Sequence, residues 1–285
     1  MNVHRFRGSA LAVVVTAACV MAGLATAGGP TPGVQMGWDG VTSAKGDFRF
    51  VAVTSARDTV VQKIATYGGR VTRHASLKGL FGVPIVAWDG TTTGLTRDGR
   101  SLVLSTMPGA GGTSMVVVDT RTLKVRQRVS LDGMWSLDAL SADARTLFLI
   151  QYLPGSNFAN YRVRAYDLRS AKLFPGAIVD KREPEAMTGI PMTRLASSDW
   201  QWAYTLYSRA EGEPFIHALD TKNRAAVCID LPWNVSPDAL TNVRMKLREG
   251  HLLVTQPTTG LLATVDLTTF KVHSLRTPVS TAARA

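Results

Sequence analysis

Two copies of the tripeptide Trp-Asp-Gly, at residues 38–40 and 88–90, are the first candidates for ligand chemistry in this sequence. Exposed indole rings can stack on a sugar or another flat ligand. Trp135 and Trp233 hold comparable places further along the chain. We expect these tryptophans to encircle one mouth of a central channel. The alternative is that they pack as wedges between neighbouring structural units.

Polar residues near the same positions complete a candidate binding site. The predicted ligand-binding set is Trp38, Asp39, Trp88, Asp89, Trp135, Asp138, Arg194 and Trp233. An enzyme of this architecture would need polar side chains that converge on one cavity, with candidates Asp39, Asp89, Asp138, Arg194 and Glu185. Glu185 also belongs to a charged connection, residues 180–185, where loops can carry function on a rigid scaffold. The alternative there is a solvated cluster of charges.

The sequence predicts no catalytic nucleophile, no metal centre and no cofactor. A Gly-x-Ser-x-Gly motif is absent, and Cys228 lies in an apolar run, where a thiol is inert. Beyond the first 27 residues the histidines show neither a His-Glu-x-x-His motif nor close spacing: His74, His217, His251 and His273. We therefore interpret them as surface or packing residues.

Turn motifs recur along the chain at intervals of about 50 residues. Similar Asp-initiated turns stand at Asp119, Asp167, Asp220 and Asp266, each after an apolar run, at spacings of 48, 53 and 46 residues. Residues 62–79 align without gaps on residues 116–133, with Ala65 in place of the aspartate and two glycines in the turn. The Asp side chain accepts backbone N–H groups one or two residues on, a structural role.

Short strands at this density, without a helical apolar period, predict an all-β fold. A repeat of this length fits a β-propeller of about five four-stranded blades, with six blades or an incompletely closed ring as alternatives. The expected units are 38–87, 88–134, 135–190, 191–233 and 234–277. Residues 115–118 are continuously apolar, as in a strand buried on both faces, whereas residues 124–131 alternate like an outer strand.

The pairing of "x-x-Asp-Gly-Arg-x-Leu-x-Leu" with "Val-x-Asp-x-x-Thr-x-x-Val" is clearest at residues 96–125. It resembles the secreted bacterial propellers of the YVTN/lactonase-like and TolB-like kind, over most of residues 38–277. The shared motifs specify blade turns, so the resemblance implies a fold and carries over no functional residue.

The N-terminus predicts export. Residues 1–27 combine Arg5 and Arg7, an apolar run and the small residues 25–27, as in a cleaved signal peptide. Residues 28–37 are expected to form a linker, 38–277 the propeller and 278–285 a tail. A lipid-anchored form through Cys19 and an uncleaved membrane anchor are the alternatives. No transmembrane segment is expected after the signal.

Without residues 1–27 the chain has 30 Lys+Arg, two fewer than the full sequence, against 21 Asp+Glu, a net charge of about +9. A basic protein outside the cytoplasm is suited to a protein partner or an anionic envelope polymer, with carbohydrate as one option, and not to nucleic acid. We therefore expect an exported, monomeric binding module. A lactonase-like or carbohydrate-active hydrolase with its site at the channel, and a scaffold in an envelope assembly, are the alternatives.

Overall fold

The computed structural model describes residues 33–155, 158, 160–184, 186–210 and 212–280. Within that part, β-strands dominate, and α1 (Pro237–Leu240) is the one helix. The described helix is far too short to cross a bilayer. The expected signal peptide, Cys19 and Glu185 lie outside the described residues.

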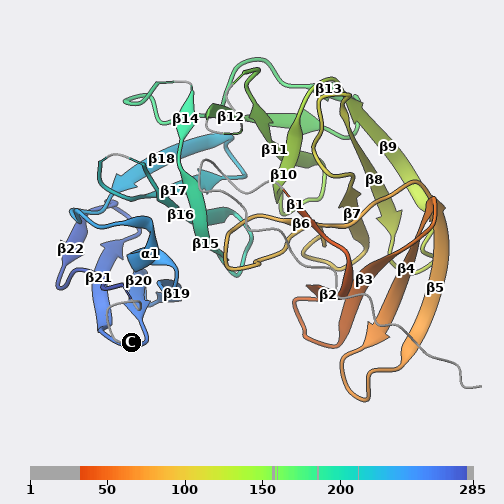
Figure 1. Ribbon diagram of the computed structural model, residues 1–285, viewed down its shortest axis with the longest axis horizontal. Coiled ribbons are helices and arrows are strands. Elements are labelled where there is room, and N and C mark those ends of the chain that lie inside the picture. Colours follow the sequence, from red (N-terminus) through yellow and green to blue (C-terminus); the bar gives the residue numbers. More distant parts are fainter. Residues whose placement is uncertain (1–32, 156–157, 159, 185, 211, 281–285) are drawn as a thin grey trace, which may run out of the picture.

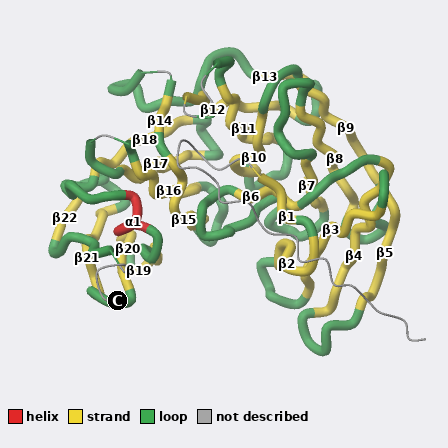
Figure 2. Tube along the Cα trace, viewed as in Figure 1, coloured by secondary structure: helices red, strands yellow, loops and turns green. Residues whose placement is uncertain are grey.

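Five antiparallel sheets follow one another along the chain (Figures 1 and 2). Sheet 1 contains β2 (Gly37–Thr42), β3 (Phe48–Ser55), β4 (Asp58–Ala65) and β5 (Val71–Lys78). Sheet 2 contains β7 (Ser101–Ser105), β8 (Thr113–Asp119) and β9 (Val125–Leu131). Sheet 3 contains β10 (Trp135–Leu140), β11 (Thr146–Tyr152), β12 (Asn160–Asp167), β13 (Lys172–Leu173) and β14 (Met187–Thr188).

The last two sheets have four strands each, in chain order. Sheet 4 contains β15 (Ile190–Ala196), β16 (Trp202–Ser208), β17 (Phe215–Asp220) and β18 (Ala225–Asp230). Sheet 5 contains β19 (Arg244–Arg248), β20 (His251–Gln256), β21 (Gly260–Asp266) and β22 (Val272–Ser274). A separate ribbon pairs β1 (Gly33–Gln35) with β6 (Val83–Ile85), so part of the expected 28–37 linker is a strand.

Strands in the middle of sheets 2, 3 and 4 are apolar on both faces because each of these sheets packs between two neighbours. In β8, Val116 and Val118 pack toward sheet 1, whereas Met115 and Val117 pack toward sheet 3. Four apolar clusters formed in this way join sheets 1 and 2, 2 and 3, 3 and 4, and 4 and 5. The prediction that residues 115–118 form a strand buried on both faces is confirmed.

Figure 1 shows the five sheets in order around an arc, with sheet 1 at one end and sheet 5 at the other. No apolar cluster and no strand pairing joins sheet 5 to sheet 1 among the described residues. The structure therefore consists of several four-stranded sheets stacked radially, without a closed ring. At the end of the arc, Gln256 holds Val279 through two hydrogen bonds of 2.8 and 3.0 Å, so the expected tail begins with a fixed segment.

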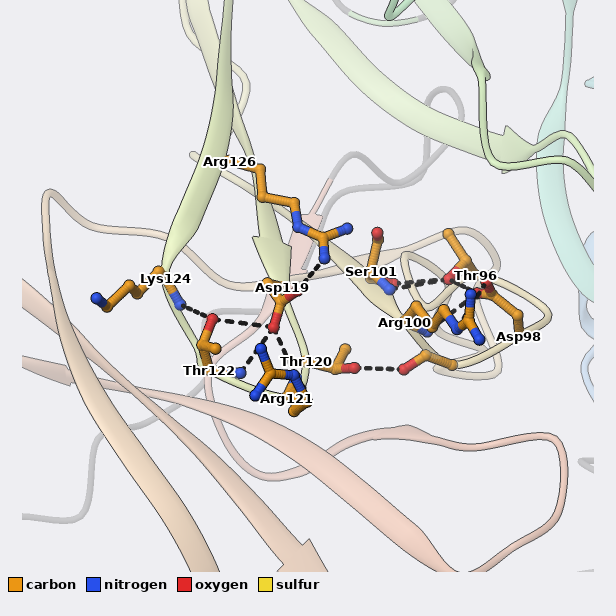
Figure 3. A network of polar contacts seen from close by, with 11 residues as sticks. Thr96, Asp98, Arg100, Ser101, Asp119, Thr120, Arg121, Thr122, Lys124 and Arg126 are labelled. Carbon is orange, nitrogen blue, oxygen red and sulfur yellow. Dashed lines mark hydrogen bonds and ion pairs between the residues drawn. The ribbon is translucent and has the colours of Figure 1, made fainter.

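Each Asp-initiated turn has the structural role expected from the sequence. Asp119 accepts hydrogen bonds from the backbone N–H groups of Arg121 (3.0 Å) and Thr122 (2.7 Å), and Arg126 contacts its other oxygen (Figure 3). Asp167, Asp220 and Asp266 make the same pair of backbone contacts. The donors lie two and three residues after each Asp. The N–H one residue after Asp119 is not available, because Thr120 N–H donates to the carbonyl oxygen of Arg100.

The gapless alignment of residues 62–79 on 116–133 is reproduced in the backbone. Four residues after each Asp, the chain adopts a left-handed conformation, with φ between 54° and 57° at Leu123, Ala171, Arg224 and Phe270. The residue at the aligned place in sheet 1 is Gly69, with φ 63°. A glycine takes this conformation without the steric cost of a Cβ atom, which explains the glycine pair in a turn that lacks the aspartate.

Candidate functional site

Asp138 and Arg194, both predicted site residues, form a buried ion pair between the innermost strands of sheets 3 and 4. Their side chains are only 5% and 7% exposed. Asp138 occupies a bulge in β10, between Leu137 and Ala139, and therefore has no partner residue on β11. Because a bulge re-aims one side chain relative to its neighbours, Asp138 points toward β15 instead of into an apolar cluster.

Buried aromatic groups and one histidine lie within electrostatic reach of this ion pair. Burial raises the pKa of Tyr207 and Tyr161, and the Asp138 carboxylate raises both further. Burial lowers the pKa of His217 to about 4, against an opposing effect of Asp138. The ring centroid of Tyr207 lies 5.9 Å from that of Tyr161 and 6.3 Å from that of His217. His217 is therefore neutral at pH 7.

Two polar atoms of this group, the Tyr161 hydroxyl oxygen and His217 Nε2, are buried without a hydrogen-bond partner. Tyr152 is better satisfied, because its hydroxyl donates to Ser136 Oγ at 3.2 Å. Sequence reasoning treated His217 as a packing residue, which its burial agrees with. The tyrosines were missed, because an apolar strand pattern does not show which hydroxyl will meet a buried charge across two sheets.

A cavity of about 190 Å³ lies beside Arg194. Its walls come from residues far apart in the sequence, on the inner strands of sheets 1 and 3, on β15, β16 and two turns of sheet 4, and on the segment between β6 and β7. The polar and aromatic lining residues are Thr42, Thr91, Thr92, Thr93, Thr96, Arg194, Trp200, Trp202 and Thr221. Hydroxyl groups, one guanidinium and indole rings give this cavity the means to bind a small polar molecule.

Strand β6 and the residues that follow it form a hairpin, residues 83–93, which we call the central hairpin. Its arms are joined by the hydrogen bonds Val86 N–H to Thr91 O (2.8 Å) and Thr93 N–H to Pro84 O (2.9 Å). It interrupts the inner position of sheet 2, where Gly82 and Leu95 pair with opposite ends of β7. The hairpin therefore emerges from one sheet into the centre of the arc (Figure 1).

The tip of the central hairpin docks on β15 of sheet 4. Trp88 N–H donates to Pro191 O at 2.7 Å, and Asp89 N–H donates to Met192 O at 3.2 Å. On the other arm, Thr92 Oγ1 donates to Gly40 O of β2 at 2.8 Å. The hairpin thus connects sheets 1 and 4, which are not neighbours along the arc, and forms one wall of the cavity.

The two Trp-Asp-Gly copies have different structures, contrary to the expected equivalence. Residues 88–90 form the hairpin tip, where Trp88 is 48% exposed and Asp89 accepts from Thr91 N–H (3.0 Å) and Thr91 Oγ1 (2.6 Å). Residues 38–40 lie in the irregular part of β2, with Asp39 exposed. A Cβ atom on Gly40 would lie 1.9 Å from Phe50 O, so this glycine is required for packing. The Trp38 side chain lies outside the described atoms.

Trp135 and Trp233 are buried between sheets, at 3% and 1% exposure. Their indole N–H groups donate to Asp132 O (2.8 Å) and Ser274 Oγ (3.0 Å). They therefore pack as wedges, the alternative noted for the sequence, and do not contribute to an aromatic ring around a channel mouth.

The long connection after Asp180 lies on the outer side of sheet 3 and does not line the cavity. Asp180 accepts hydrogen bonds from Cys228 N–H (2.9 Å) and from Arg182, whose guanidinium holds the pKa of Asp180 below its usual value. Of the five polar residues named for an enzyme, the described structure brings only Asp138 and Arg194 together. The described residues contain no group of His, Cys, Asp or Glu side chains placed for a metal ion.

Comparisons with known proteins support the fold alone. No family model and no curated protein matches the sequence. Among solved structures, TolB from Acinetobacter baumannii is 10% identical with a TM-score of 0.44, and the match covers 79% of this chain and 50% of that one. A putative 6-phosphogluconolactonase from Bacteroides uniformis is 14% identical with a TM-score of 0.42, covering 82% of each chain.

A putative TolB from Agrobacterium tumefaciens is 12% identical, with a TM-score of 0.43 and coverage of 82% of this chain and 78% of that one. This chain thus spans half the length of the first TolB structure. It resembles TolB-like and lactonase-like propellers at the level of the fold, and nothing about activity follows from identities this low.

Proposed function

We propose that this chain is an exported β-propeller-like binding module of five blades, which holds a small polar ligand in the cavity beside Arg194. The observation that carries the proposal is the composition of that cavity, whose walls come from three sheets and the central hairpin. Export is supported by the N-terminal 27 residues of the sequence, and the five blades by the five sheets around the arc.

The chemistry of the walls defines the class of ligand. Threonine hydroxyls can both donate and accept hydrogen bonds, and a guanidinium donates to oxygen acceptors. Arg194 is already neutralised by Asp138, so the cavity does not need an anion to balance its charge. At about 190 Å³ it is smaller than the ~300–1,000 Å³ typical of sites for drug-sized ligands. A hydroxyl-bearing molecule with a single small ring fits these properties.

The proposal is tested with a cavity-blocking substitution. Purified protein is screened by thermal shift and calorimetry against monosaccharides and small hydroxy acids, alongside mass spectrometry of molecules that co-purify with it from the envelope fraction. Ala196 lines the cavity and is exposed, so Ala196→Trp places an indole at the opening without disturbing the core. Ala225→Trp, at an exposed position of β18 that does not line the cavity, is the matched control.

We expect saturable binding in the wild type and in Ala225→Trp, and at least a tenfold loss in Ala196→Trp. Binding that survives in Ala196→Trp would place the ligand elsewhere and contradict the proposal. Conversion of a bound ligand into a product would replace the binding-module proposal with the hydrolase alternative.

A further inference from the structure

A second surface, which shares no lining residue with the cavity, has the composition of an anion-binding groove. It is an open depression of about 740 Å³ at the end of sheet 1, where β4 turns into β5 at the lower right of Figure 1. Four cationic side chains line it, together with one carboxylate, Asp47. The cations are Lys63, Arg70, Arg73 and Arg121, and none of them makes an ion pair with another described residue.

Two of these cations are placed directly against each other. Lys63 of β4 and Arg73 of β5 are cross-strand partners in the antiparallel ladder. Side chains at directly opposed positions lie on the same face about 5 Å apart at Cβ, and like charges there destabilise a sheet. Neutral residues at these two surface positions would avoid this loss of stability. An anion that binds between the two side chains would account for the presence of two cations there.

The nearby carboxylate offsets only one of the four positive charges of the groove. Asp47 accepts a hydrogen bond from Ser43 Oγ at 2.5 Å and belongs to the β2–β3 turn. Lys63 instead lies over an aromatic ring, with its Nζ atom 3.9 Å from the centroid of Phe48. Arg121 reaches the groove from the β8–β9 turn of sheet 2. Cations from two sheets therefore border one open groove with a local excess of positive charge.

The groove also has an exposed aromatic ring. Tyr67, in the β4–β5 turn, is 97% exposed, the highest value among the large hydrophobic residues that are exposed. A tyrosine ring that packs against nothing in its own chain is available to stack on a flat or ring-shaped ligand. Phenolic and cationic groups side by side suit a chain of sugar rings that carries regular carboxylates.

From these contacts we propose that the groove bordered by Lys63, Arg70, Arg73 and Arg121 binds an acidic polysaccharide, with carboxylates between Lys63 and Arg73 and a sugar ring against Tyr67. This site is independent of the cavity beside Arg194, and it gives the module a means to attach to an anionic polymer while the cavity holds a small ligand.

The experiment measures binding of polygalacturonate oligomers by calorimetry at low and at physiological ionic strength. Dextran is the neutral comparison, and a single-stranded oligonucleotide of similar length is the comparison polyanion. The charge variant is Lys63→Gln/Arg73→Gln, and the ring variant is Tyr67→Ala. Lys124→Gln/Arg128→Gln removes the same charge from β9, the outer strand of sheet 2, and from the residue just before it, and is the matched control.

We expect the wild type to bind polygalacturonate but not dextran, with an affinity that falls as salt rises. Lys63→Gln/Arg73→Gln should bind about tenfold more weakly, and Tyr67→Ala should bind more weakly with an unchanged salt dependence. The control should retain wild-type affinity. The unfolding midpoint of the single variant Arg73→Gln should equal or exceed that of the wild type, because it removes the like-charge contact and keeps the contact of Lys63 with Phe48.

Three results would overturn the proposal. They are the absence of polygalacturonate binding at low salt, an equal loss in the charge variant and its control, and tighter binding of the oligonucleotide than of polygalacturonate. A lower unfolding midpoint in Arg73→Gln would contradict the like-charge contact on which the site rests. Ala196→Trp should leave polygalacturonate binding intact, so this proposal and that of the cavity can fail separately.

Discussion

The backbone N–H of Trp88 donates to the carbonyl oxygen of Pro191 at 2.7 Å, which joins the central hairpin to a sheet two positions along the arc. The sheets themselves contact only their neighbours through apolar clusters. This hydrogen bond, with that of Thr92 to Gly40, is therefore a link between parts of the fold that the stacking of sheets does not connect. The cavity wall depends on the position of the hairpin.

Gly94 at the base of the hairpin gives the first prediction. It has φ +109°, and a Cβ atom there would lie 2.4 Å from Val103 O. Gly94→Ala should therefore lower the free energy of unfolding by about 2 kcal/mol or more, since both strain and a backbone clash result. Gly90→Ala is the control, because Gly90 also has positive φ (+82°) but no atom within 4 Å of the added Cβ.

Chemical denaturation of the two variants checks this prediction. Gly90→Ala should lose about 1 kcal/mol, the usual cost of a left-handed conformation. Equal losses in the two variants would show that Gly94 is not held against β7.

The buried ion pair between sheets 3 and 4 gives the second prediction. Removing one partner leaves an uncompensated charge, so Asp138→Leu or Arg194→Met should each lower the free energy of unfolding by about 3–5 kcal/mol. The double variant Asp138→Leu/Arg194→Met should lose much less than the two single losses together, because no charge remains buried. Additive losses in a double-mutant cycle measured by urea unfolding would contradict direct coupling of the two side chains.

How far the sequence predicts this molecule depends on whether a feature is local. The turn at Asp119 and the burial of both faces of the strand at 115–118 are set by neighbouring residues. The structure contains the turn and the buried strand that the sequence predicts. The expected units 135–190 and 191–233 match sheets 3 and 4, whose inner strands begin at Trp135 and Ile190. The match is poorer for sheet 5, because β19 begins at Arg244 and the unit was expected from residue 234. Asp138 and Arg194, two of the polar residues expected to converge on one cavity, do meet.

The central hairpin was beyond prediction for a physical reason. It is held by a hydrogen bond from the backbone N–H of Trp88 to the backbone carbonyl of Pro191. Every residue type has such a carbonyl, and every type except proline has such an N–H, so residue identity does not reveal the contact. The repeated Trp-Asp-Gly tripeptide suggested equivalent places in two units, whereas one copy lies in an irregular strand and the other in a hairpin tip. Arc closure likewise depends on contacts between chain ends, which a local repeat does not encode.

The third prediction concerns the stability of the protein in mild acid. His217 has a folded pKa of about 4, against 6.5 when exposed, because burial disfavours its charged form. As the pH falls from about 6.5 toward 4, the unfolded chain takes up a proton that the folded chain does not, so stability decreases. We expect a loss of about 2 kcal/mol from this group between pH 7 and pH 4.5.

Urea unfolding of the wild type and His217→Gln over this pH range isolates the effect. The variant should show a shallower decline in unfolding free energy, because glutamine does not titrate. Parallel pH profiles for the two proteins would mean that His217 is protonated in the folded state.

The fourth prediction concerns the contact of Asp180 with β18. Asp180 accepts hydrogen bonds from Cys228 N–H and from Arg182, and Arg182 lowers the pKa of its carboxyl. Its contribution is therefore present above about pH 4 and is lost as the pH falls further. Asp180→Ala should lower the free energy of unfolding at pH 7 by about 1.5–3 kcal/mol, the range for hydrogen bonds to a charged group.

The same substitution should expose Cys228. Burial raises the pKa of this thiol to about 12, so the wild type should react very slowly with a disulfide reagent at pH 8. Asp180→Ala should accelerate the reaction, whereas Asp230→Ala, at an exposed position of the same strand, should not. Rapid modification of the wild type would show that the 174–184 connection does not cover β18.

The last prediction uses the left-handed residue that follows each Asp-initiated turn. Ala171 is exposed and has φ 54°, a conformation that costs an L-residue about 1–2 kcal/mol and glycine almost nothing. Glycine also raises the entropy of the unfolded chain, which offsets part of the gain. Ala171→Gly should therefore stabilise the protein by about 0.5 kcal/mol. Ala142→Gly, at an exposed turn position without positive φ, should destabilise it by about 0.5–1 kcal/mol. Opposite signs in thermal unfolding would confirm that Ala171 occupies the place that Gly69 fills in sheet 1, and equal signs would contradict it.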